Sequence, residues 1–146
     1  MLQDVIINMH SVQGYDKDNT DSIDFSTDGL YTFEDDTGCL TYMESEITGM
    51  KGTRTSVLVM PDRVVVDRDG PVTSRMEFKE GEKSSFLYST PFGQATLGIR
   101  TRKINRNFNE SGGNVEIDYV VDMDHVAVSQ NKFMIDVKRT GDRTNA

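Results

Sequence analysis

The alternation of apolar and polar residues in short segments is the feature that most constrains how this chain can fold. From Val115 to Met123, odd positions are apolar or aromatic and even positions are mostly acidic. Residues 72–79 alternate in the same way. A period of two is typical of a strand that buries only one face. The pattern therefore predicts an all-β chain.

Segments of this kind recur along the whole chain, separated by turn residues. We expect strands at residues 4–14, 20–33, 39–47, 53–60, 63–68, 72–80, 83–90, 93–106, 113–123 and 125–138. All three prolines, Pro61, Pro71 and Pro91, lie between these segments, where they remove no ladder hydrogen bond. Links of about two to six residues suit antiparallel hairpins and leave no room for helical crossovers.

The predicted fold is a single antiparallel up-and-down β-barrel of about eight to ten strands. One domain would fill residues 1–146, with an ordered core over about 4–138 and a polar tail from Thr140 to Ala146. The phase of the alternation selects the side chains expected to face the barrel interior. These are Ile23, Phe25, Val57, Val59, Val64, Val66, Met76, Phe78, Leu97, Ile99, Val115, Ile117 and Tyr119.

Composition excludes several classes of partner. The net charge of −8 opposes binding to a nucleic-acid backbone, which requires clustered Lys and Arg. No segment approaches the roughly 20 consecutive apolar residues of a membrane helix, and the first residues do not form a secretory signal. The lone Cys39 fits a reducing compartment. We expect a cytoplasmic protein with no nucleic-acid or membrane partner.

Residues that carry catalysis or bind metals are scarce. The chain has one cysteine and two histidines, His10 and His125, and neither histidine stands in a catalytic signature. A zinc site needs several such ligands. No phosphate-binding loop or dinucleotide fingerprint is present. We therefore expect no metal, no cofactor and no enzymatic activity.

One end of the predicted barrel gathers polar residues. In an up-and-down meander, the strands that end near Glu44, Arg68 and Tyr88 all finish at the same end. Their phase turns these side chains and Tyr42 inward, beside the turn that contains Phe92. An unpaired buried arginine is costly, so Glu44 is the expected counterion of Arg68. The cluster either closes the barrel end as an ion pair or anchors a carboxylate or phosphate of a ligand.

Two functions follow from this scaffold. A hollow barrel would be a binding module for a small, partly apolar ligand in its interior or mouth, held by Tyr42, Glu44, Arg68, Tyr88 and Phe92. A filled barrel would be a structural or interaction protein. Its acidic surface, between Asp16 and Glu46, would then meet a partner. An empty pocket of a few hundred cubic ångströms would favour the binding module over the filled barrel.

Several turn and strand-end motifs occur in a familiar order. They are Phe25-Ser26-Thr27-Asp28-Gly29, Tyr42-Met43-Glu44, Arg68-Asp69-Gly70, Tyr88-Ser89-Thr90-Pro91-Phe92-Gly93, and Gly112-Gly113-Asn114-Val115 with Tyr119. Together, from about Ile23 to Val137, they resemble the YwiB-like family of small bacterial proteins of unknown function. The resemblance implies a cytoplasmic, calycin-like β-barrel, similar in architecture to lipocalins and fatty-acid-binding proteins. It implies no activity and no functional residues.

Overall fold

The computed structural model describes residues 2–16, 19–124 and 126–140. Its strands are β1 (Gln3–Asp16), β2 (Asn19–Glu34), β3 (Thr37–Met43), β4 (Arg54–Val59), β5 (Val64–Asp69), β6 (Ser74–Phe78), β7 (Lys83–Thr90), β8 (Gly93–Asn109), β9 (Gly112–Met123) and β10 (Val126–Arg139). His125 and all of the predicted tail except Thr140 lie outside the described residues. No helix in the described part is long and apolar enough to cross a membrane.

The predicted third strand ends earlier than expected. β3 stops at Met43, and the short 3-10 turn η1 (Glu46–Thr48) follows. The side chain of Ser45 accepts a hydrogen bond from the backbone N–H of Ile47, and Gly49 closes the turn with a positive φ of 77°. Local capping at both ends of η1 therefore replaces the end of the predicted strand with a short turn.

The strands form one ten-stranded antiparallel sheet in the order β6-β5-β4-β3-β2-β1-β10-β9-β8-β7. Every pair consists of sequence neighbours except β1 and β10, whose pairing runs from Val5–Arg139 to Gly14–Gln130. The two edge strands, β6 and β7, are joined by an isolated bridge between Thr73 and Ser89. We call this edge-to-edge junction the seam. The prediction of an up-and-down barrel, here nearly closed, is confirmed.

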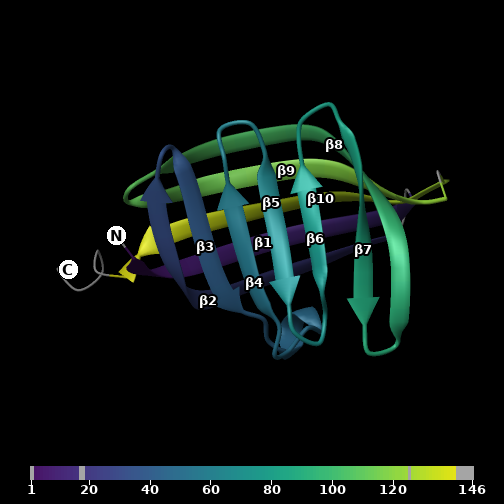
Figure 1. Ribbon diagram of the computed structural model, residues 1–146, viewed down its shortest axis with the longest axis horizontal. Coiled ribbons are helices and arrows are strands. Elements are labelled where there is room, and N and C mark those ends of the chain that lie inside the picture. Colours follow the sequence, from purple (N-terminus) through teal and green to yellow (C-terminus); the bar gives the residue numbers. More distant parts are fainter. Residues whose placement is uncertain (1, 17–18, 125, 141–146) are drawn as a thin grey trace.

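Strand lengths differ strongly around the barrel. β1, β2, β8, β9 and β10 contain 12 to 17 residues, whereas β3 to β6 contain 5 to 7. Figure 1 shows the short strands crossing in front of the long ones, which continue past them toward the β1–β2 and β9–β10 hairpins. The long layer is therefore covered over only part of its length.

The core occupies the covered part. Most residues that the sequence predicts to face inward are buried there or pack against it. Ile23 has the predicted inward phase, opposite Ser11 of β1, but it is 39% exposed and is not buried in the core. Ile23 shares the inward phase of Phe25, but β3 pairs with β2 only from Leu30 to Glu34. Ile23 lies on the uncovered part of β2, where no short strand pairs beside it.

One end of the barrel is sealed by aromatic packing and hydrogen bonds, and we call it the closed end. Tyr31 is 0% exposed, and its hydroxyl donates to the carbonyl of Asn109 at 2.6 Å. The Tyr31 and Phe108 rings lie 6.1 Å apart. A Cβ at Gly38 would meet the Tyr31 ring at 3.1 Å, so a larger residue there would force the ring to shift by a few tenths of an ångström.

Candidate ligand-binding cavity

The other end of the barrel, which we call the hollow end, contains a cavity of about 490 Å³. Apolar side chains of the core form much of its wall, among them Val57, Val66, Phe86 and Leu97. Met123, at the overhanging end of β9, also lines the cavity and is exposed. The cavity therefore extends from the core to the uncovered end of the long strands.

Methionines contribute an unusual share of the lining. Met9, Met50, Met76 and Met123 line the cavity, out of eight methionines in the whole chain. Methionine side chains are flexible and polarizable, and they adapt to ligands of different shape. Met50 reaches the cavity from the connection between β3 and β4. The alternation predicted the inward phase of Met76 and placed Met123 in an apolar series, but it did not indicate that the methionines gather at one cavity.

Glu44 is a buried and firmly held carboxylate beside the cavity. Its side chain is only 1% exposed. One carboxylate oxygen, Oε1, accepts from the Thr48 hydroxyl at 3.1 Å, and Oε2 accepts from the Thr55 hydroxyl at 2.5 Å. The backbone N–H of Glu44 donates to the Thr53 carbonyl at 2.8 Å. Two hydroxyl donors thus fix the negative charge in place.

Arg68 lies between this carboxylate and the cavity. Its Nε is 3.7 Å from Oε2 of Glu44, and its Nη1 is 3.7 Å from Sδ of Met76. Nε is buried and has no hydrogen-bond partner among the described residues. A guanidinium offers five N–H donors, and a thioether is a weak acceptor. Arg68, with 19% of its side chain exposed, therefore keeps most of its hydrogen-bonding capacity unused.

Three tyrosines, Tyr42, Tyr88 and Tyr119, add hydroxyl groups to the cavity wall. Burial raises the pKa of Tyr42 above its ordinary range, and the Glu44 charge raises it further, while Arg68 lowers it. Burial raises the pKa of Tyr119 to about 12, against a smaller lowering by Arg68. A phenol is already protonated near neutral pH at its ordinary pKa, so the raised pKa values of Tyr42 and Tyr119 extend this state into alkali, and both hydroxyls can donate to an acceptor in the cavity.

The structure brings most of the predicted polar cluster together. Tyr42, Arg68 and Tyr88 line the cavity, and Glu44 supports Arg68 from behind it. Cross-strand register explains the assembly, because Thr55 pairs with both Tyr42 and Arg68. Tyr119, whose inward phase was predicted, is a polar wall residue that the predicted cluster did not include.

The placement of Phe92 in the cluster is wrong. Phe92 is 99% exposed and does not line the cavity. The backbone N–H of Phe92 donates to the Thr90 hydroxyl at 3.1 Å, and Gly93 has a φ of 144°. This tight turn between β7 and β8 leaves the ring outside the barrel.

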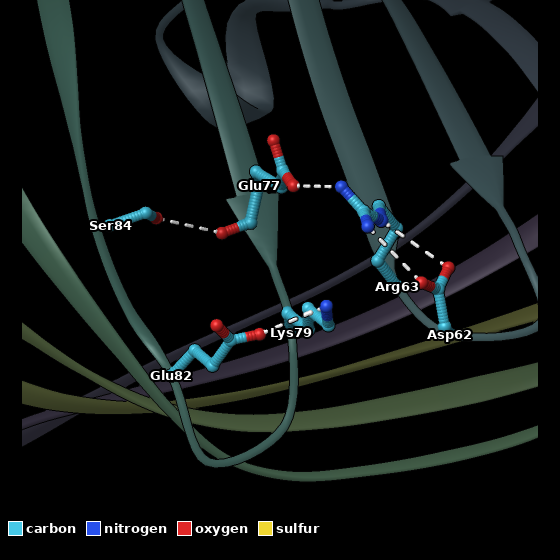
Figure 2. A network of polar contacts seen from close by, with 6 residues as sticks. All are labelled: Asp62, Arg63, Glu77, Lys79, Glu82 and Ser84. Carbon is cyan, nitrogen blue, oxygen red and sulfur yellow. Dashed lines mark hydrogen bonds and ion pairs between the residues drawn. The ribbon is translucent and has the colours of Figure 1, made fainter.

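A second polar cluster lies outside the barrel, near the seam (Figure 2). Arg63 pairs with Asp62 and Glu77, and Lys79 pairs with Glu82 at 3.2 Å. Ser84 donates to the backbone carbonyl of Glu77 at 3.0 Å, which links β7 to β6. The hydrogen bond from Arg63 lowers the pKa of Asp62. Of these contacts, the Ser84 hydrogen bond is the one that joins the two edge strands, because the ion pairs lie on β6 and in the β4–β5 and β6–β7 connections, where exposed pairs contribute little stability.

The fold and the cavity define a small up-and-down β-barrel that is filled at one end and hollow at the other. A family model described as "Domain of unknown function (DUF1934)" matches residues 7–135, and the chain belongs to this family. The resemblance to YwiB-like proteins is thereby confirmed.

A curated relative and a solved structure agree with this assignment. The chain is 29% identical over 120 residues to the uncharacterized beta-barrel protein YwiB of Bacillus subtilis (strain 168), covering 82% of this chain and 83% of the relative. It also matches the crystal structure of the ywiB protein from Bacillus subtilis with a TM-score of 0.83 and 24% identity. That match covers 94% of this chain and 92% of the other, and it shows the same fold.

Proposed function

We propose that the protein is a non-catalytic binding module for a small, partly apolar molecule held at the hollow end. The observation that carries this proposal is the cavity of about 490 Å³, lined by apolar side chains and by the incompletely bonded Arg68. Ligand pockets typically measure about 300–1,000 Å³ and combine an apolar wall with a few polar groups. The cavity falls within that class in both volume and lining.

The two parts of the wall would hold two parts of the ligand. Removal of apolar ligand surface from water contributes roughly 25 cal/mol per Å². Arg68 can bind an anionic group through two parallel N–H donors, which fixes the orientation of the ligand as well as its affinity. The hydroxyls of Tyr42, Tyr88 and Tyr119 line the same cavity and can donate further hydrogen bonds.

The alternative is a structural or interaction protein whose barrel is filled and whose acidic surface binds a partner. The cavity favours the binding module, because a purely structural barrel would fill this end with side chains as it fills the closed end. The calycin-like architecture implied by the family resemblance agrees with this preference, since small barrels can enclose one ligand. We place the protein in the cytoplasm on the strength of its lone Cys39.

Native mass spectrometry of the protein purified under mild conditions tests the proposal. The wild type should retain a small molecule, and folded Arg68→Met should lose it, although loss of the counterion of the buried Glu44 carboxylate lowers the melting temperature of this variant. Arg63→Met is the matched control, because Arg63 is also ion-paired but lies outside the barrel. This control should retain the molecule. A ligand kept by Arg68→Met together with a large fall in its melting temperature would instead assign Arg68 to a structural ion pair.

A further inference from the structure

The charges around the cavity narrow the chemistry of the ligand, provided that the proposed binding function holds. We infer that the ligand is a monocarboxylate with an apolar tail, and that the site rejects phosphate monoesters of the same length. The inference rests on the balance between Arg68 and Glu44, which meet with Nε and Oε2 at 3.7 Å.

The first step concerns the charge that the cavity already contains. Arg68 is the one charged residue among the described residues that line it. Glu44 stands directly behind, and both of its oxygens are occupied by Thr48 and Thr55. With 1% of its side chain exposed, Glu44 cannot turn toward water to leave Arg68. The pair therefore presents a guanidinium whose positive charge is only partly compensated, because Nε and Oε2 are 3.7 Å apart and Nε makes no hydrogen bond to a described residue.

The second step concerns the groups that the cavity offers to a ligand. Arg68 lowers the pKa of both Tyr42 and Tyr119, so these two wall residues lie within its electrostatic reach, and phenols are protonated hydrogen-bond donors near neutral pH. The weak contact from Arg68 to the Met76 sulfur is easily replaced by an oxygen acceptor. The site thus favours an acceptor group, and a charged acceptor makes the stronger hydrogen bond to a guanidinium.

The third step compares one negative charge with two. A carboxylate adds a single charge, which Arg68 faces directly. A phosphate monoester carries about −1.5 to −2 charges near neutral pH. Its second charge would meet no second cation among the wall residues that the structure describes, and it would be repelled by the fixed carboxylate of Glu44. Glu44 therefore acts as a positioning residue that limits the charge of the head group.

Isothermal titration calorimetry with three probes that share one tail tests this inference. The probes are decanoate, decyl phosphate and 1-decanol, each below its aggregation concentration and near neutral pH. We expect decanoate to bind the wild type about tenfold more tightly than either of the others, the equivalent of about 1.4 kcal/mol. Equal binding of all three probes would overturn the inference and leave the proposed binding function standing. Absence of binding by all three would overturn both.

Glu44→Gln tests the role of the counterion. Removal of its charge should raise the affinity for decyl phosphate about tenfold relative to decanoate, because the uncompensated Arg68 can then accept a second negative charge. Glu77→Gln is the matched control, since Glu77 pairs with Arg63 on the outside of the barrel. It should leave the order of the three probes unchanged. An unchanged preference in folded Glu44→Gln would refute the positioning role, and the wild-type comparison decides the inference if that variant does not fold.

Discussion

The closed end and the hollow end of the barrel are built from the same long strands, yet only one of them is filled. Along β9, Val115 and Ile117 are fully buried at the closed end, whereas Val121 and Met123 keep the same inward phase and line the cavity. The short strands β3 to β6 cover only part of the long layer (Figure 1). Strand length therefore decides where an inward side chain enters a packed core and where it borders empty space.

The comparison also separates stability from binding. Tyr31 and Phe108 seal the closed end by ring packing, and the Tyr31 hydroxyl is bonded to Asn109. At the hollow end, Arg68 has a buried Nε that no described residue bonds. An unsatisfied buried donor lowers the stability of the folded protein, and a ligand that supplies the missing acceptor gains binding free energy from it. Substitutions at the two ends should thus have different consequences.

The largest effect is expected at the closed end. Tyr31→Ala should lower the free energy of unfolding by about 3–5 kcal/mol, because it leaves a large void in a fully packed region. Tyr31→Phe removes only the hydrogen bond to Asn109 and should cost about 1 kcal/mol. Urea denaturation monitored by circular dichroism measures both values. A cost below about 1 kcal/mol for Tyr31→Ala would show that this end is not tightly packed.

Overpacking on one strand compares the two ends directly. Val115→Phe should lower the free energy of unfolding by about 1–3 kcal/mol, because the enlarged side chain finds no room in the core. Val121→Phe has the same phase on β9 but extends into the cavity, and it should cost less than about 0.5 kcal/mol. Thermal unfolding distinguishes the two variants. Similar costs at both positions would mean that the hollow end is as tightly packed as the closed end.

A comparison of one buried ion pair, Glu44 with Arg68, and one exposed ion pair, Glu77 with Arg63, provides a finer test of stability. Glu44→Gln should lower the free energy of unfolding by about 1–2 kcal/mol. This is less than the roughly 3–5 kcal/mol typical of breaking a fully buried pair, because Arg68 borders the cavity. Glu77→Gln, in the exposed pair with Arg63, should have a smaller effect. Urea denaturation of both variants measures these losses. A larger loss of unfolding free energy in Glu77→Gln than in Glu44→Gln would contradict the expected order.

A further expected effect is a loss of stability in alkali. Burial raises the pKa of Tyr31 and of Tyr119 to about 12 in the folded protein, from an ordinary value of 10.0. Between these values the folded state binds more protons than the unfolded state, so stability falls as the pH rises from about 10 to about 12. Ultraviolet titration of Tyr31→Phe and Tyr119→Phe separates the two groups. Ordinary titration of both phenols would contradict their burial.

A bound carboxylate should change only one of these two tyrosines. Arg68 lowers the pKa of Tyr119, and an anion that neutralises Arg68 would weaken this effect. The pKa of Tyr119 should therefore rise in the presence of decanoate, while that of Tyr31 beside Arg106 should not change. Ultraviolet titration with and without decanoate measures the difference.

Local pattern was sufficient to predict the strands and much of the polar cluster. The phase of Arg68 follows from β5 and that of Glu44 from β3, which ends one residue before it, and antiparallel connectivity places both at one end of the barrel. The exposure of Ile23 could not be predicted, because it depends on how far β3 runs along β2. The outward position of Phe92 depends on a turn geometry that includes Gly93. These outcomes are set by strand lengths and turn shapes, which period-two alternation does not encode.

The pairing of β1 with β10 has a consequence for how the protein folds during synthesis. Val5 pairs with Arg139, so the ribosome must deliver Val126–Arg139 before the ladder between these strands can form. Contacts between such distant segments make folding slow. Until β10 docks, β1 with 14 residues and β9 with 12 are unpaired edges that can template aggregation. After β10 docks, the remaining edge strands are the two at the seam, β6 with 5 residues and β7 with 8. Docking of β10 therefore replaces long, aggregation-prone edges with short ones.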